Sequence, residues 1–374
     1  MSLLILKKYL YPVVVISGSI IGVGFFSLPY IAMKSGFWIT LFYFLVLSIV
    51  VLAIHLIFTE ISLKTPDYKR FPGFARHYLG KWGQIFAFFS TIISSYGVLL
   101  AYLIVGSGFL KNIMEPYFGE KYIFYILIYF LFVNIIVWFG IKAVSRVELL
   151  VLFLLFLSVI FIFIKGFNYI NLSNLFVYNQ QLDFSKLFLP YGPILFSLWG
   201  VSLIPEAEEM LKNNKKLVKR VVIISTLIPV LFYLFFTFLV LSITGDQTTE
   251  SALLGVKQFL GNGTSTIIFL TGLFTTITAY IAHALTLKKV FSFDLKIKNW
   301  QAFVMTCFVP LILFLVGLNS FIEIISFIGA FLLGINGILI LLMYKKIGGK
   351  NYLIYPLSIT FLLGIIYQII YFIK

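Results

Sequence analysis

The fold of this protein is decided by residues 17–29, which read SGSIIGVGFFSLP. This stretch lies in an uncharged run over residues 9–33, and those 25 residues are long enough to cross a bilayer as one helix. Its three glycines and its proline are poor residues for a helix interior, because glycine costs conformational entropy and proline removes a backbone hydrogen bond. An opened backbone is tolerated in hydrocarbon only where it is buried or lines a wet cavity. We therefore predict a helix broken near Gly22–Gly24, with freed N–H and C=O groups facing a site. The alternative for this stretch alone is a continuous helix whose small residues serve close packing.

The composition excludes a soluble globular protein, because 61% of the residues are hydrophobic, 11% are charged and the mean hydropathy is +1.08. Charged residues divide the chain into long apolar runs, each of which is a candidate span. The sequence therefore predicts an all-α integral membrane protein with eleven transmembrane helices in a single domain over residues 1–374. The runs cover residues 9–33, 35–59, 82–110, 122–141, 149–164, 187–205, 221–245, 258–287, 299–322, 324–344 and 351–373.

The net charge of +15 sets the topology. If the N-terminus is cytoplasmic, 21 of the 28 Lys and Arg residues fall in inside segments, as the positive-inside rule requires. The charge therefore predicts a multi-pass protein of the cytoplasmic membrane, with the N-terminus inside and the C-terminus outside. It also favours contact with anionic membrane lipid over binding to nucleic acid.

Residues that carry enzymatic or metal chemistry are sparse. Cys307 is the one cysteine, and His55, His77 and His283 have no metal-ligand spacing. Gly22-x-Gly24 lacks the third glycine and the strand that a dinucleotide site needs. We expect no enzyme, no metal site, no cofactor beyond a coupling ion, and no obligate protein partner.

The broken helix has a counterpart further along the chain. Residues 196–205 read FSLWGVSLIP, and Gly200 precedes Pro205 by five residues, as Gly24 precedes Pro29. The charge count makes the first helix run outward and the sixth run inward. Two interrupted helices at matching positions of antiparallel halves indicate an inverted-repeat transporter, although one such spacing can arise by chance. The expected units are residues 1–166 with five helices, 184–346 with five helices, and 351–373 with an eleventh.

These two segments resemble the first and sixth helices of the amino acid–polyamine–organocation superfamily, including the Lys212-Asn213 pair after the sixth. The amino acid/auxin permeases and the aromatic amino acid permeases are the most similar families. The resemblance implies the fold of the bacterial leucine transporter (LeuT), with helices 1 and 6 discontinuous. Further matches are Leu28-Pro29-Tyr30, Gly80-Lys81-Trp82-Gly83, Tyr96-Gly97, residues 102–106, and Phe274 with Thr278.

Carried over by motif position, the resemblance implies a site for an amino acid zwitterion. The backbone amides of Val23 and Gly24 would hold the carboxylate, and the carbonyls near Ile20 and Phe196 would take the ammonium. A half-helix N-terminus offers unpaired N–H groups and a partial positive charge to an anion. The expected substrate-binding residues are Ser19, Ile20, Gly22, Val23, Gly24, Tyr102, Phe196, Trp199, Gly200 and Ser202.

The side-chain pocket is expected to be neutral. Val23 stands where many relatives have serine, and Ser202 stands where some relatives carry a gating glutamate, which argues against a dibasic substrate. Aromatic residues, among them Phe196, Trp199 and Tyr102, are candidates to line the pocket, and the alternative for each of them, favoured by the high aromatic content, is ordinary packing. We expect a secondary active transporter that moves a neutral, hydrophobic or aromatic amino acid by alternating access. The alternative is a receptor on the same scaffold that binds without translocating.

The coupling ion is expected to be a proton or sodium. A sodium site in this fold would combine carbonyls of the first helix with hydroxyls of the eighth, where Thr275 and Thr278 share one face. Ala279 replaces the serine of the expected Thr-Ser pair, and such threonines often bond back to their own helix. Lys165 lies too near the outer end to replace the helix-five lysine of some proton-coupled relatives.

Glu206 is the candidate proton carrier, because it lies six residues past Gly200, which is about 9 Å along a helix axis. An ionisable residue at that depth suggests a function, and the alternative is an ion pair that holds the cytoplasmic gate shut. His55 and His283 are further proton-carrier candidates, with packed, hydrogen-bonded histidines as the alternative.

Overall fold

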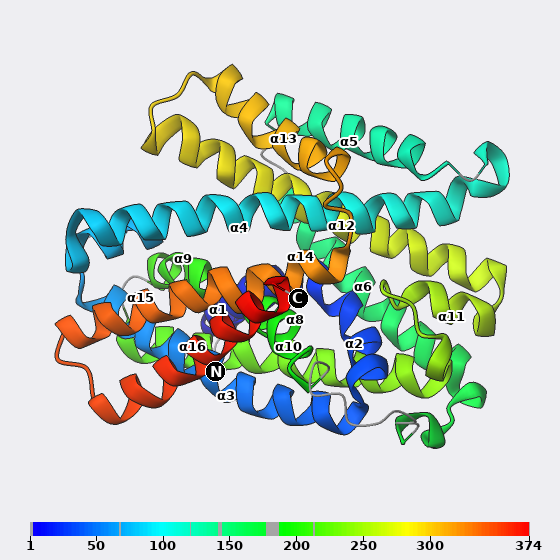
Figure 1. The fold of residues 1–374 in the computed structure, drawn as a ribbon, viewed down its shortest axis with the longest axis horizontal. Helices are drawn as coiled ribbons and strands as arrows, with labels where there is room; N and C mark the ends of the chain where they lie inside the picture. The colour runs from blue at the N-terminus through cyan, green and yellow to red at the C-terminus, as the bar shows by residue number, and fades with distance from the viewer. Residues whose placement is uncertain are drawn as a thin grey trace.

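The computed structural model describes residues 3–66, 69–119, 121–140, 144–176, 187–211 and 214–373, and its regular elements are helices (Figure 1). The start of the second expected repeat at residue 184 and the pair Lys212-Asn213 lie outside these residues. The α-helices are α1 Leu3–Ile20, α2 Leu28–Ser35, α3 Phe37–Lys64, α4 Phe71–Phe118, α5 Tyr122–Phe139, α6 Val144–Gly166, α8 Tyr191–Leu198, α9 Ile204–Met210, α10 Lys215–Thr244, α11 Leu253–Leu260, α12 Asn262–Lys289, α13 Asn299–Leu315, α14 Phe321–Phe327, α15 Leu333–Lys346 and α16 Asn351–Ile373. Short 3₁₀ segments are η1 Val23–Ser27, η2 Phe167–Tyr169, η3 Leu172–Leu175, η4 Val201–Leu203 and η5 Gly245–Gln247, and π segments are η6 Val290–Asp294 and η7 Ile328–Leu332.

The number of spans differs from the eleven expected. Within the described residues, eight helices are long and apolar enough to cross a membrane, and the bent α1–α2 pair makes nine. The expected runs at 187–205 and 299–322 do not reach this length, for two different reasons. The first is split into α8 and α9, of eight and seven residues. The second forms α13, whose 17 residues extend about 25 Å, somewhat less than the ~30 Å hydrocarbon core.

The helices pack in two groups, and α4, which runs the length of the molecule, belongs to the first of them (Figure 1). In one group α4 packs against α5, α12 and α13. In the other group α10 packs against α1, α2 and α3, and α3 packs against α8 and α9. The two broken segments, α1–α2 and α8–α9, belong to this second group, so both are held by the same long helices α3 and α10.

The long helix α4 contains an elbow. Its first turns run from Phe71 to Leu79, and Gly80 then adopts φ 77° and ψ −160° before the longer part of the helix begins. Only glycine reaches this conformation without strain, so Gly80 determines where the helix bends between its two parts.

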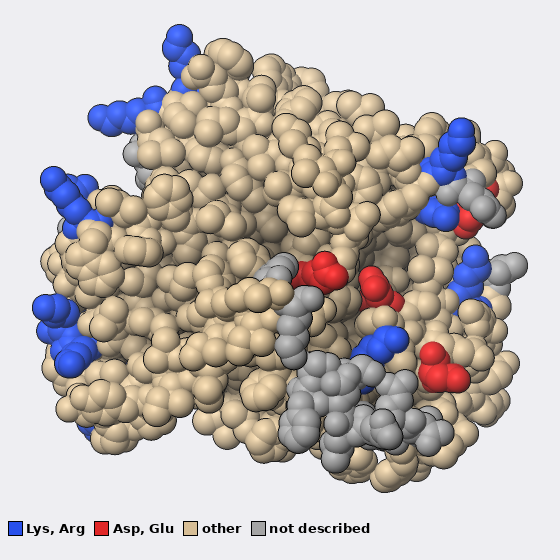
Figure 2. Space-filling view, in the orientation of Figure 1, with Lys and Arg blue, Asp and Glu red and all other residues tan. Residues whose placement is uncertain are grey.

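Lys and Arg side chains gather mainly at the ends of the molecule, while acidic side chains also lie nearer the middle of the face (Figure 2). Figure 2 shows most of the Lys and Arg side chains of this face at the left end, where α4 begins and α15 leads into α16. Uncharged side chains cover most of the area between the ends. This distribution matches a membrane protein with a strongly basic side.

Candidate functional site

The first break lies between α1 and η1. Helix α1 ends at Ile20, η1 begins at Val23, and the two halves are bent by 50°. Gly24 allows the opened segment to approach α8, because a Cβ atom there would lie 2.8 Å from the Phe196 ring and closer still to the Ser197 hydroxyl. The break predicted near Gly22–Gly24 is therefore present, and glycine is needed for the second broken segment to pack against it.

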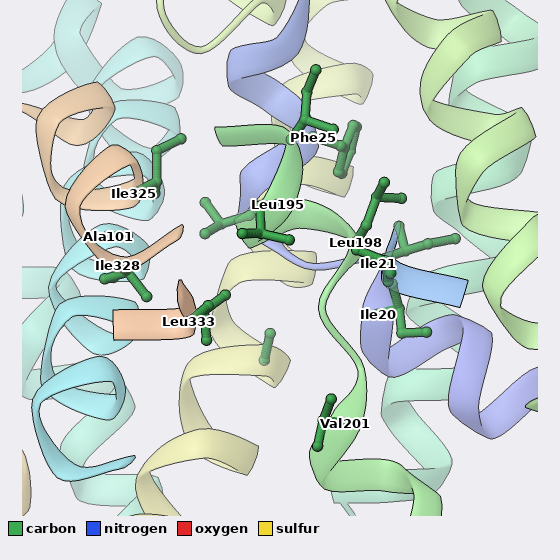
Figure 3. Packing of buried hydrophobic residues seen from close by; sticks show 14 of the residues in the cluster. Ile20, Ile21, Phe25, Ala101, Leu195, Leu198, Val201, Ile325, Ile328 and Leu333 are labelled. Carbon is green, nitrogen blue, oxygen red and sulfur yellow. The ribbon is translucent and has the colours of Figure 1, made fainter. Parts of the chain in front are cut away.

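The second break lies between α8 and α9. Helix α8 ends at Leu198, Trp199 is extended with φ −75° and ψ 118°, and helical structure resumes at Val201. Figure 3 shows the ribbon as an extended stretch between Leu198 and Val201, beside Ile20 and Ile21 of the first break. A Cβ atom on Gly200 would lie 2.7 Å from the Ile20 side chain. The two breaks therefore lie side by side, as the repeat spacing predicted.

A tyrosine hydroxyl joins the two breaks. The Tyr233 hydroxyl on α10 lies 2.9 Å from the Ile20 carbonyl oxygen and 3.1 Å from the Ser197 carbonyl oxygen, and it donates to this pair. These carbonyls belong to the last turns of α1 and α8, where helices leave carbonyls without the usual intrahelical partners. The Ile20 carbonyl also accepts from the Gly22 amide at 2.8 Å. Near Phe196, where a free carbonyl was expected, the Phe196 carbonyl accepts from the Trp199 amide at 3.4 Å. The carbonyl there that meets the Tyr233 hydroxyl is that of Ser197, one residue later.

The N-terminal turn of η1 supplies donors next to these acceptors. The first N–H groups of a helix have no intrahelical partner, so the amides of Val23 and Gly24 are available to an anion. The break thus places donors beyond residue 22 and acceptors before it. A zwitterion, which carries both an anion and a cation, matches this arrangement.

Two aromatic side chains lie beside the first break. A Cβ atom on Gly22 would lie 2.7 Å from the Tyr102 hydroxyl oxygen of α4. The Tyr102 ring in turn lies 5.6 Å from the His283 ring of α12, and His283 Nδ1 lies 3.1 Å from the Ala279 carbonyl oxygen. Tyr102 is therefore adjacent to the break as expected, and His283 packs against the Tyr102 ring.

A histidine holds the second break. The Gly200 N–H donates to His55 Nε2 at 3.0 Å, and His55 Nδ1 lies 2.9 Å from the Thr226 hydroxyl oxygen. Since the Thr226 hydroxyl donates to the Val222 carbonyl, it accepts from His55, and the proton of the neutral imidazole is on Nδ1. His55 of α3 thus links the opened segment to α10. In the sequence, this role of His55 in binding the Gly200 amide is indicated only by a polar residue within an apolar run.

An aromatic plug closes the side of the break towards α2. It consists of Phe25, Phe26, Phe109, Phe236 and Phe269, all buried. Ring centroids lie 4.9 Å apart for Phe25 and Phe236, 5.1 Å for Phe26 and Phe109, and 6.2 Å for Phe109 and Phe269. The opposite side, towards α9, has exposed Ser202 and Glu206 instead. The site is therefore sealed on one side by contacting aromatic rings.

Other expected residues have different surroundings from the paired carbonyls. Ser202 is exposed in η4, and Ser19 is half-buried one residue before the end of α1. Trp199 contacts the His55 and Phe361 rings edge-on at 6.4 Å. The Thr275 and Thr278 hydroxyls donate to carbonyls of their own helix, Thr275 to that of Thr271 at 2.8 Å.

Within the acidic run of α9, the buried residue is Glu208, not Glu206. The Glu208 carboxylate accepts a short hydrogen bond from the Ser62 hydroxyl of α3. Glu206 is exposed, and its carboxylate is repelled by that of Glu209 and attracted by the cations of Arg70 and Lys289. Sequence reasoning selected Glu206 by depth alone. Which of three neighbouring glutamates faces α3 depends on where the helix resumes after the break.

Comparison with known proteins gives a consistent result. The model of the tryptophan/tyrosine permease family matches residues 6–366. A curated relative, the tyrosine-specific transport system 1 of Haemophilus influenzae, is 24% identical over 230 residues, which are 61% of this chain and 56% of the relative. The match thus spans little more than half of that relative's length.

Solved transporters share the fold at low sequence identity. A manganese transporter of Eremococcus coleocola, solved with an aromatic bis-isothiourea compound, matches with a TM-score of 0.69 at 12% identity, over 98% of this chain and 86% of that chain. A nucleobase-cation-symport-1 family transporter, solved closed with bromovinylhydantoin, matches with a TM-score of 0.67 at 13% identity, over 97% and 90%. These matches show a LeuT-type fold.

Proposed function

This chain belongs to the tryptophan/tyrosine permease family, a family of transporters and not of enzymes, and we propose that it carries an aromatic amino acid across the cytoplasmic membrane by alternating access. The observation that carries the proposal is the pair of adjacent helix breaks bridged by Tyr233. The family and the relative's specificity for tyrosine favour tryptophan, tyrosine or phenylalanine as the substrate.

In the proposed complex the substrate carboxylate accepts from the amides of Val23 and Gly24. The ammonium donates to the Ile20 and Ser197 carbonyls, which in this structure accept hydrogen bonds from the Tyr233 hydroxyl. An ammonium has three donors and a full charge, whereas the phenol has one donor, so the ammonium is the stronger partner for two carbonyls. The substrate therefore displaces the Tyr233 hydroxyl when it binds.

The proposed topology has eleven crossings, with the N-terminus inside and the C-terminus outside. The α8–α9 segment crosses as a broken helix, like α1–α2, and α13 crosses with its apolar flanks. Residues 1–166 and 184–346 then form the two inverted repeats, and 351–373 form the added helix. The basic end seen in Figure 2 is the cytoplasmic side under the positive-inside rule.

With this orientation the aromatic plug faces outside, and the exposed residues Ser202 and Glu206 face the cytoplasm. The structure then represents a state closed to the outside. Transport requires the half-helices to tilt against the group formed by α4, α5, α12 and α13, so that the plug opens and the inner side closes.

A proton or sodium gradient drives uptake in this proposal. The own-helix hydrogen bonds of Thr275 and Thr278 already use their hydroxyl donors, while their oxygen lone pairs remain possible sodium ligands. Glu206 remains the candidate proton carrier, since it lies on the cytoplasmic side of the second break beside the like-charged Glu209, with the cations Arg70 and Lys289 also nearby.

Uptake into proteoliposomes tests the function. We expect the purified protein to accumulate labelled tryptophan, tyrosine or phenylalanine under an imposed proton or sodium gradient, but not lysine or arginine. Protein-free vesicles and vesicles without a gradient are the controls. Binding of the same amino acids, seen as thermal stabilisation, without accumulation under either gradient would identify a receptor and contradict a transporter.

A further inference from the structure

The two helix breaks match in the sequence but differ in the partner of one backbone amide. Gly24 and Gly200 each precede a proline by five residues, and each lies at the start of the 3₁₀ turn that follows its break, η1 or η4. In the proposed complex the Gly24 amide donates to the substrate carboxylate. The Gly200 amide already donates within the protein, to His55 Nε2 at 3.0 Å. One break therefore offers this amide to a ligand, and the other pairs it with a side chain.

The imidazole of His55 accepts from Gly200 because its proton is on the other nitrogen. His55 Nδ1 lies 2.9 Å from the Thr226 hydroxyl oxygen, and the Thr226 hydroxyl donates to the Val222 carbonyl at 2.8 Å. The Thr226 oxygen is thus the acceptor of the Nδ1 proton. Since a neutral imidazole has one donor and one acceptor nitrogen, Thr226 sets the tautomer in which the lone pair on Nε2 meets the Gly200 amide.

The contact is buried, and it is not the only tie between α3 and the second broken segment. The His55 side chain is 1% exposed, and a Cβ atom on Gly200 would lie 3.4 Å from His55 Cε1. About two turns further along α3, the Ser62 hydroxyl donates to the Glu208 carboxylate of α9. A substitution of His55 therefore leaves α9 anchored to α3 and acts mainly on the extended stretch.

We propose that His55 is a positioning residue for the substrate, because its Nε2 takes the place at the second break that the substrate carboxylate takes at the first. This inference rests on the proposed function. With the Gly200 amide paired, the carboxylate is directed to the first break. The Ser197 carbonyl, three residues before Gly200, is held in place for the ammonium. The amino acid therefore binds in one orientation.

Two amide side chains separate the two contacts of His55. Glutamine can place its carbonyl oxygen near the position of Nε2 and still accept from the Gly200 amide, whereas asparagine reaches only the position of Nδ1, towards Thr226. In proteoliposomes we expect H55N to raise the KM for the transported amino acid about tenfold, because a buried amide loses its acceptor and the extended stretch shifts. The maximal rate per folded protein should change by less than about threefold, and H55Q should keep its KM within about threefold of that of the unmodified protein.

Thr226 offers a second, independent pair of variants. T226V removes the acceptor of the Nδ1 proton, so the proton gains nothing by staying there, and on Nε2 it would oppose the Gly200 N–H. We expect T226V to raise KM several-fold, whereas T226S keeps the hydroxyl and should not. Valine and serine each differ from threonine by a small change, so this pair decides the question if H55N fails to fold.

Fewer folded molecules with an unchanged KM in H55N would show that His55 only packs and would overturn the proposal. Equal KM values in H55N and H55Q would also overturn it. Loss of accumulation in H55Q under an imposed proton gradient, at an unchanged KM, would show that His55 acts by taking up a proton. Absence of uptake by the unmodified protein would contradict the proposed function instead. The amino acid concentration that stabilises the protein against heat then replaces KM, and the same comparison of H55N with H55Q decides the role of His55.

Discussion

Gly24→Ala is expected to reduce substrate uptake by about 100-fold or more while the protein stays folded in the membrane. The new methyl group would lie 2.8 Å from the Phe196 ring and closer to the Ser197 hydroxyl. Real Cβ atoms do not approach this closely, so η1 and α8 must move apart at a cost of about 1–3 kcal/mol. A displacement of about 1 Å at a site of positioned groups can cost roughly two orders of magnitude in rate. Initial uptake rates in proteoliposomes, normalised to reconstituted protein, measure the effect.

Gly108→Ala is the matched control for this change. Gly108 lies inside α4, and a Cβ atom there would have no heavy atom within 4 Å. We expect uptake close to that of the unmodified protein. If Gly24→Ala transports as well as Gly108→Ala, the close approach of the two breaks is not part of the substrate site.

Tyr233→Phe is expected to destabilise the substrate-free protein by about 1–3 kcal/mol, because the buried Ile20 and Ser197 carbonyls lose the Tyr233 donor, although the Ile20 carbonyl keeps its bond from the Gly22 amide. In the presence of saturating substrate the loss should largely vanish, since the ammonium then serves both carbonyls. The variant should therefore show a larger substrate-induced rise in unfolding temperature than the unmodified protein. Thermal unfolding with and without the transported amino acid measures the difference.

Tyr125→Phe provides the control for a lost tyrosine hydrogen bond. The Tyr125 hydroxyl donates to the Gly119 carbonyl at 2.7 Å, at the start of α5 and away from both breaks. Its removal should lower the unfolding temperature equally with and without substrate. The same pattern in Tyr233→Phe would mean that Tyr233 is a packing residue and does not occupy the ammonium position.

The sequence was sufficient to predict the two breaks, since glycine and proline disrupt a helix locally wherever it packs. Gly24 and Gly200 lie 176 residues apart, yet each marks its own break, and their equal distances from Pro29 and Pro205 indicated that the breaks are related.

The residues that join the breaks could not be predicted in this way. Tyr233 is one of 22 tyrosines, and nothing in the sequence distinguishes it from the others. Its partners are the backbone carbonyls of Ile20 and Ser197, and any residue type can supply a backbone carbonyl. His55 likewise meets Gly200 through a backbone amide 145 residues away. The eleven spans predicted from charge-free runs also exceed the number of helices that are long enough to cross a membrane. A charge-free run does not show where a helix is interrupted, as the helix is at Trp199.

The central claim is that two adjacent helix breaks together hold an amino acid zwitterion. A structure determined by electron cryomicroscopy with the transported amino acid bound tests it most directly. We predict ligand density with the carboxylate at the amides of Val23 and Gly24, the ammonium within about 3 Å of the Ile20 and Ser197 carbonyls, and the Tyr233 hydroxyl moved away from them. Continuous helices in place of the breaks, or ligand density elsewhere with the Tyr233 hydroxyl still on both carbonyls, would contradict the claim.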